Sequence, residues 1–182
     1  MHPTKNNLPE KTRSKVIALL NGLLAGAIDL KLHAKQAHWN VKGAGFIALH
    51  KLLDDTAGAV EEFADLIAER AVALGGSAEG LVTHVQGRSA LEPYPEGIFE
   101  ARDHLDAITT SVAAFAKAAR AGIDEAASWK DAVTADLLTG VTRDLDKQLW
   151  FLEAHLQGRE QAGGSRTSPV HSRVHRPRVL VP

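Results

Sequence analysis

The stretch Gln36 to Gly76, QAHWNVKGAGFIALHKLLDDTAGAVEEFADLIAERAVALGG, decides the fold. In its second half, residues 46–74, apolar residues recur at the spacing of one buried helical face. They are Phe46, Leu49, Leu53, Val60, Ala64, Ile67, Ala71 and Leu74. This pattern predicts one long helix over 46–74, packed through that face against a helical core.

A second stripe on the same predicted helix is ionisable. At about 100° of rotation per residue, one imidazole and four carboxylates project within about a third of the circumference. They are His50, Asp54, Glu61, Asp65 and Glu69. Imidazole nitrogens and carboxylate oxygens are ligands for iron and similar ions. The stripe therefore predicts a cation site beside the buried face.

The spacing of the stripe indicates where that site lies. His50 and Asp65 are fifteen residues apart, which is on the order of 22 Å along a continuous helix, whereas ligands of one metal lie about 2.0–2.2 Å from it. One copy of the helix cannot satisfy both conditions. Two copies that cross antiparallel near Ala57, Gly58 and Ala59 can, because small residues allow close approach. We predict a metal site between subunits, two per dimer.

Short motifs in this region resemble a known family. AHWN, then FIALH, then D-x-x-x-E before RA and LGG are similar to the signature of the DNA-protecting starvation proteins (Dps), in the ferritin-like superfamily. The resemblance runs from about Ser14 to Gln157 and includes YP and RDLDKQLWF further along. It implies a ferroxidase site between two-fold-related subunits. His38, His50 and Asp54 would come from one subunit, and Asp65 and Glu69 from the other.

The same resemblance implies an activity. The chain would form a hollow dodecamer that oxidises Fe²⁺ with hydrogen peroxide or dioxygen, stores the ferric mineral and protects DNA. Iron is the expected metal, with His38, His50, Asp65 and Glu69 as the ferroxidase residues. Asp54 is either a further ligand or a hydrogen-bond partner of one. Trp39 would lie near the site, either absorbing oxidising equivalents or packing in the interface.

The rest of the chain predicts an all-α, ferritin-like four-helix bundle in residues 9–158. Amphipathic periods indicate four helices: 9–40, 46–74, 98 to about 122, and one from 128–131 to 158. The connection over 76–96, with one short helix, is long enough for a crossover between parallel helices. No Glu-x-x-His pair occurs, which counts against a di-iron site built within one chain.

Composition narrows the remaining choices. Apolar residues make up 45% of the chain, aromatic residues 5%, and cysteine is absent, so thiolate sites are excluded. No apolar run suggests a signal sequence or a membrane span, and a cytoplasmic, nucleoid-associated protein is expected. The acids Asp124, Glu125 and Asp131 are candidates for a three-fold pore or for ordinary turn and capping residues.

Two terminal segments lie outside the predicted bundle. Residues 1–8 are expected to be disordered, and residues 159–182 to form a basic, flexible tail. Cationic side chains that could bind DNA without sequence preference are Lys5, Lys11, Arg13, Lys15, Arg159, Arg166, Arg173, Arg176 and Arg178. The tail could instead aid solubility or assembly. The alternative for the whole protein is a nucleoid-compacting shell whose metal, such as zinc, is structural, without significant ferroxidase activity.

Overall fold

Five helices make up most of residues 1–163, the part of the chain that this computed structural model describes. Their bounds are α1 Glu10–Asn40, α2 Phe46–Ala73, α3 Val82–Arg88, α4 Ala101–Ser128 and α5 Ala132–Gly163. The described residues contain no β-strand, only an isolated bridge between Lys42 and Glu100. The all-α prediction is confirmed.

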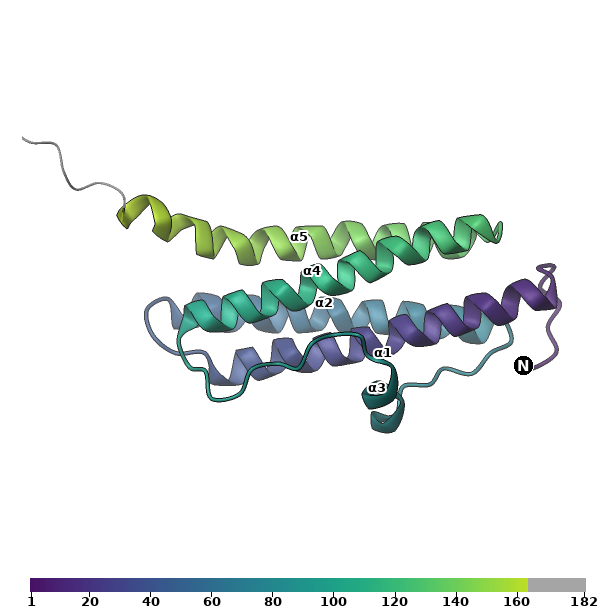
Figure 1. Ribbon diagram of the computed structural model, residues 1–182, viewed down its shortest axis with the longest axis horizontal. Helices are drawn as coiled ribbons and strands as arrows, with labels where there is room; N and C mark the ends of the chain where they lie inside the picture. Colours follow the sequence, from purple (N-terminus) through teal and green to yellow (C-terminus); the bar gives the residue numbers. More distant parts are fainter. Residues whose placement is uncertain (164–182) are drawn as a thin grey trace, which may run out of the picture.

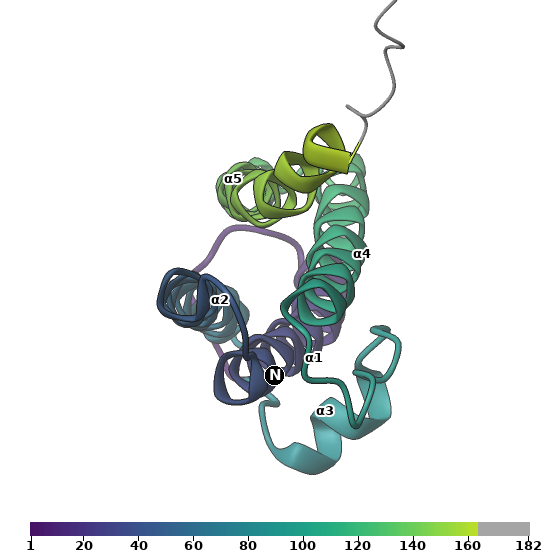
Figure 2. The ribbon, with the colours of Figure 1, turned by 90° about the vertical axis from the view of Figure 1, so that its left-hand side faces the viewer.

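The four long helices form two antiparallel hairpins, α1 with α2 and α4 with α5 (Figure 1). The hairpins meet mainly through α1 and α4, as the end-on view shows (Figure 2). The segment between α2 and α4 runs back along the bundle and carries α3 on the outside of α1. The predicted four-helix bundle with one long crossover is therefore confirmed.

The buried face of α2 agrees with the sequence pattern at most positions. Leu53, Val60 and Ile67 are almost completely buried in the common core. Phe46 differs, because it stands at the first position of the helix and stays 38% exposed. Phe63 and Thr56, outside the predicted stripe, are buried as well, so the face that α2 buries is wider than one row of side chains.

Glycines define both ends of α2. Gly43 and Gly45 in the turn after α1 have φ of 97° and 78°, in the left-handed region that side chains disfavour. At the other end Gly75 has φ 88°, its N–H donates to the Val72 carbonyl, and the Gly76 N–H donates to the Ala71 carbonyl. This pair of bonds is the Schellman motif that ends many helices.

Two helix ends were predicted wrongly. α4 continues past Gly122 to Ser128, because Gly122 is a packing position rather than a cap: a Cβ there would lie 3.0 Å from Leu138 and 3.2 Å from Leu23. α5 continues past Gly158 to Gly163, through residues that favour helix. The outer part of the expected tail, residues 164–182, lies outside the described residues.

Residues 1–8 were expected to be disordered, but the structure places them along the end of α2. The His2 N–H donates to the Gly75 carbonyl at 2.6 Å, and Leu8 packs against the core. Arg13, in the first turns of α1, donates from Nη1 to the Leu74 carbonyl at 2.9 Å. These bonds satisfy carbonyls that the end of α2 leaves without helical partners.

Within the described residues, α1 is the one helix whose length and apolar composition would suffice to span a membrane. About 61% of its most apolar window is buried inside the bundle. The core helix of a folded domain meets the same criteria of length and composition, and burial of this kind accounts for the apolar residues of α1.

A polar network holds the crossover to the bundle. Tyr94 Oη lies 2.8 Å from His104 Nδ1 on α4, and Ser89 donates its hydroxyl to Asp29 on α1 at 2.5 Å. Asp29 also approaches His33 Nε2 at 3.5 Å. The other ring nitrogen of His33 lies 3.0 Å from Ser111 Oγ of α4. Both histidines are buried, so their protonation affects stability.

We expect mild acid to destabilise the protein through these histidines. Burial lowers the pKa of both His33 and His104 below 6.5. The charge of Asp29 opposes this shift at His33, and the Ile98 backbone and the charge of Asp103 oppose it at His104. Because the unfolded chain then binds more protons, the free energy of unfolding falls as pH drops below 6.5. Denaturant titrations across this range should show the fall, and His104→Gln should reduce it. An equal pH dependence in the variant would contradict this assignment.

Candidate functional site

The turn over residues 41–45 brings His38, near the end of α1, beside His50, in the second turn of α2. Their rings are stacked, with centroids 3.7 Å apart and an interplanar angle of 23°. The Phe46 ring lies 5.0 Å from that of His50. Both histidines are half-buried, so the pair is held by neighbouring groups yet stays open to solvent.

Two reciprocal hydrogen bonds fix the orientation of this pair. His38 Nδ1 lies 2.7 Å from the His50 carbonyl, and His50 Nδ1 lies 2.9 Å from the His38 carbonyl. A carbonyl only accepts, so each Nδ1 must donate its proton. In the neutral rings, both Nε2 atoms then carry the lone pair. This is the arrangement seen around metal-binding histidines, where a backbone carbonyl holds the other ring nitrogen.

Asp54 lies one turn after His50 and is engaged by a lysine. Lys35 Nζ, from α1, donates to Asp54 Oδ1 at 2.6 Å. This hydrogen bond, together with the charges of Lys35, His38 and His50, outweighs the effect of desolvation and lowers the pKa of Asp54. The carboxylate is therefore kept ionised beside the histidine pair, but a metal ion at Asp54 would have to displace the ammonium.

The remaining two predicted ligands lie farther along the same helix. Asp65 and Glu69 are both exposed on α2, and α2 is one continuous helix over Phe46–Ala73. Within residues 1–163, no three His, Asp or Glu side chains converge as they would around a metal ion. A single subunit therefore brings His38 and His50 into contact, with Asp54 one helical turn after His50, but it does not bring Asp65 and Glu69 to them.

The lysines of α1 are the part of this site that the sequence analysis missed. Lys35 binds Asp54, and Lys31 pairs with Glu61 at 2.6 Å. Both precede His38 by a multiple of about one helical turn, which was the available signal. Lys35 Nζ also lies 5.7 Å from the ring centroid of Trp39, whose side chain is 65% exposed.

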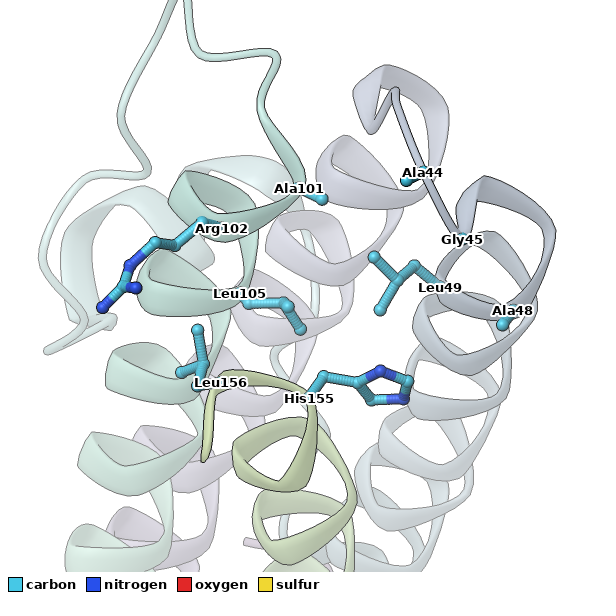
Figure 3. Close-up of a pocket in the computed structure, with 9 residues that line it drawn as sticks. All are labelled: Ala44, Gly45, Ala48, Leu49, Ala101, Arg102, Leu105, His155 and Leu156. Atoms are coloured by element: carbon cyan, nitrogen blue, oxygen red, sulfur yellow. The ribbon is translucent and has the colours of Figure 1, made fainter. Parts of the chain in front are cut away.

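A cavity of about 230 Å³ opens at the same end of the bundle (Figure 3). Leu49, Leu105 and Leu156 lie around it, and Arg102 of α4 and His155 of α5 also line it. Among the side chains that the structure describes, no carboxylate lines this cavity, and none of the five predicted ligands contributes to it. The cavity is therefore a poor match for a cation, unlike the surface that carries His38 and His50.

The structure removes Asp131 from the predicted pore acids. Its carboxylate is 1% exposed and accepts from Arg70 Nη2 at 2.9 and 3.1 Å. It also accepts from the Thr134 N–H at 3.1 Å, as the cap of α5. Burial alone raises the pKa of Asp131, but the bonds from Thr134 and Arg70 outweigh burial and lower it. Asp124 and Glu125 lie on α4 and are exposed; their pore role stays a prediction.

Comparison with known proteins gives a consistent result. The ferritin-like domain family matches residues 17–161. A "DNA protection during starvation protein" of Agrobacterium fabrum is 48% identical over 156 residues, 86% of this chain and 96% of that relative. The structure of Mycobacterium smegmatis Dps superposes with a TM-score of 0.82 at 32% identity, covering 94% of this chain and 96% of that one. For DpsA14 from Streptomyces coelicolor the TM-score is 0.81 at 35% identity, covering 91% and 96%. The chain belongs to the Dps family of ferritin-like proteins.

Proposed function

We propose that this protein is a ferroxidase and iron store that oxidises Fe²⁺ with hydrogen peroxide or dioxygen. The observation that supports this most is the His38–His50 pair, whose Nδ1 protons are given to backbone carbonyls. Two imidazole lone pairs beside the ionised Asp54 make a nitrogen and oxygen donor set suited to iron as a substrate. Asp65 and Glu69 of a second copy complete the proposed set.

A second copy of the chain is needed because His50 lies far from Asp65 and Glu69 along the same continuous helix, α2. On the face of α2 opposite the core, exposed residues recur at helical spacing: Ile47, Asp54, Gly58, Asp65 and Val72. Asp65 also borders an open groove of about 510 Å³ with apolar side chains of α1 and of residues 78–81. An exposed stripe of apolar, small and acidic residues favours the pairing of two α2 helices from different subunits. A closed shell of twelve subunits would contain this two-fold contact six times.

Gly58→Leu should weaken this pairing. Inside the subunit a Cβ at Gly58 has no neighbour within 4 Å, so the fold should tolerate leucine, while a close helix crossing would not. We expect a shift toward smaller species in analytical ultracentrifugation. Gly140→Leu is the matched control, because Gly140 is also helical with free space around its Cβ. Unchanged assembly of the Gly58 variant would refute a crossing at this point.

The chemistry of the site follows from its ligands. Two ferrous ions supply the two electrons that reduce one hydrogen peroxide to two water molecules, with two protons taken from solvent. Carboxylates stabilise the higher charge of the ferric product, and neutral imidazoles bind both oxidation states. Oxidation of both ions together avoids the one-electron reaction that releases hydroxyl radical.

The direct test mixes the metal-free protein with Fe²⁺ anaerobically, adds stoichiometric peroxide, and follows ferric absorbance while trapping hydroxyl radical. The proposal requires oxidation faster than in a protein-free control, with less trapped radical. A rate equal to the control would eliminate the ferroxidase function. It would favour the alternative, a DNA-binding shell with a structural metal such as zinc.

We also propose non-specific DNA binding, in keeping with a cytoplasmic, nucleoid-associated protein. The structure reduces the number of N-terminal cationic side chains that are free to contact DNA. Arg13 is bonded to the carbonyls of Leu8 and Leu74, and Lys15 lies 5.6 Å from the Trp129 ring centroid. Lys5 and Lys11 remain, together with arginines after residue 158. Repeated across many subunits, such weak phosphate contacts would sum.

Truncation after Gly163 should therefore weaken DNA binding. It removes Arg166, Arg173, Arg176 and Arg178 from every subunit, so both the affinity and the steepness of its salt dependence should fall. Mobility shifts with long duplex DNA at several salt concentrations measure both. The untruncated chain is the reference, and iron oxidation should not change. Equal binding by the two proteins would exclude the tail as the DNA contact.

A further inference from the structure

Tyr94 and His104 form a hydrogen-bonded pair that the proposed function does not use. Tyr94 is the single tyrosine of the chain, and its Oη lies 2.8 Å from His104 Nδ1. The two rings are nearly parallel, at 18°, with centroids 6.1 Å apart. His104 is 1% exposed and Tyr94 is half-buried. A half-buried phenol is therefore held against a buried basic nitrogen.

The environment fixes the position of the proton. Burial raises the pKa of Tyr94, so the phenol keeps its proton. Burial also lowers the pKa of His104, so the ring is neutral and its Nδ1 accepts from the phenol. His104 Nε2 is buried without a hydrogen-bond partner in the described structure. The nearby Ile98 backbone raises the pKa of His104, but by less than burial lowers it.

We propose that Tyr94 and His104 are a redox-active pair that removes one-electron oxidants formed during iron oxidation. A buried phenol that lost only an electron would become an unpaired buried cation, which is costly. Transfer of its proton along the existing hydrogen bond to His104 Nδ1 avoids this at the moment of oxidation. The hydrogen bond thus lowers the barrier to oxidising this tyrosine.

The step balances when peroxide meets a single ferrous ion. One electron from that Fe²⁺ splits peroxide into hydroxide and a hydroxyl radical. The phenol of Tyr94 supplies the second electron, the radical becomes hydroxide, and the phenolic proton moves to His104 Nδ1. A later Fe²⁺ returns an electron to the tyrosyl radical, and His104 returns the proton, so the pair is restored and the iron becomes ferric.

The fold connects this pair to the proposed iron site through α1. The Tyr94 ring lies 5.1 Å from the ring of His33, and His33 is held by Ser111 and Asp29. His33 precedes His38 by five residues on α1, about 7.5 Å along the helix axis. His33 and the intervening turns of α1 thus link the pair to the proposed iron site, and the protective role rests on the ferroxidase function proposed above.

The pair can be tested first without iron. Flash oxidation of the metal-free protein by a photoexcited ruthenium polypyridyl complex, followed by electron paramagnetic resonance, should yield a tyrosyl radical that forms more slowly in heavy water. Tyr94→Phe should abolish the radical. His104→Gln keeps a hydrogen-bond acceptor without a basic nitrogen, and should slow formation at least about tenfold. Trp150→Phe, which changes an exposed ring of α5 and leaves the pair intact, is the control.

The second arm adds peroxide to protein that carries at most one Fe²⁺ per site, because the radical forms when peroxide meets a single ferrous ion and further Fe²⁺ would reduce the tyrosyl radical. We expect a tyrosyl radical in the wild type, and more trapped hydroxyl radical in Tyr94→Phe at an unchanged initial rate of iron oxidation. If His104→Gln, folded by circular dichroism, behaved as the wild type in the iron-free arm, the pair would be refuted. Normal iron oxidation without a Tyr94 radical would refute its protective role. If the wild type did not oxidise iron at all, the ferroxidase proposal would be overturned, and with it the protective role of Tyr94. The iron-free arm would still decide whether Tyr94 and His104 form a redox-active pair.

Discussion

We expect Asp131→Ala to lower the free energy of unfolding by about 3–5 kcal/mol, the usual cost of breaking a buried ion pair. The change leaves the guanidinium of Arg70, 12% exposed, without its carboxylate, and it also removes the cap of α5. The pair joins the last turn of α2 to the corner between α4 and α5, so its loss loosens contacts between the two hairpins. Chemical denaturation at fixed protein concentration measures the difference.

Two further variants separate charge from capping. Asp131→Asn keeps a good cap residue but loses the charge, and its stability should fall between those of the wild type and the alanine variant. Asp146→Ala removes the half-exposed partner of Arg120, a loss of about 0–1 kcal/mol. Equal losses for the 131 and 146 alanine variants would contradict a central role for the Arg70 pair.

Much of this fold could be predicted from sequence because helical periodicity is a local property. The buried row on α2 and the glycine turns that bound it were correctly placed for that reason. The end of α4 was not, because only the three-dimensional contact with Leu23 and Leu138 shows that Gly122 packs instead of capping. The glycine looks the same in sequence in either role.

The candidate site, like the fold, could be predicted from sequence only in part. The contact between His38 and His50 follows from a short turn between two helices, and the sequence pointed to both residues. The pairing of Lys35 with Asp54, and of Arg70 with Asp131, joins segments 19 and 61 residues apart. Such pairs depend on how helices rotate against each other, which the pattern of a single helix does not specify. The sequence therefore left Asp131 as either a pore acid or a turn and capping residue, and it did not identify Arg70 as its partner.

The proposed iron site makes its sharpest prediction in mixed assemblies. His38→Ala removes one imidazole of the pair, and Asp65→Ala removes a carboxylate of the opposite half. Each variant alone should lose peroxide-driven Fe²⁺ oxidation by about 100-fold, the upper end of the loss seen when even an orienting group around a metal is removed. His155→Ala, which alters an exposed histidine of the apolar cavity, should leave the rate unchanged.

Co-assembly of the two inactive variants then distinguishes a shared site from one within a chain. In a mixed dimer, the intact His38 of the Asp65→Ala chain faces the intact Asp65 of the His38→Ala chain. Half of randomly formed dimers are mixed, and each has one intact site of two, so about a quarter of the activity should return. A site within one chain would regain none, because every chain would still lack a ligand. Recovery after joint refolding, but not after mixing preassembled proteins, would therefore establish that two copies of α2 make each site.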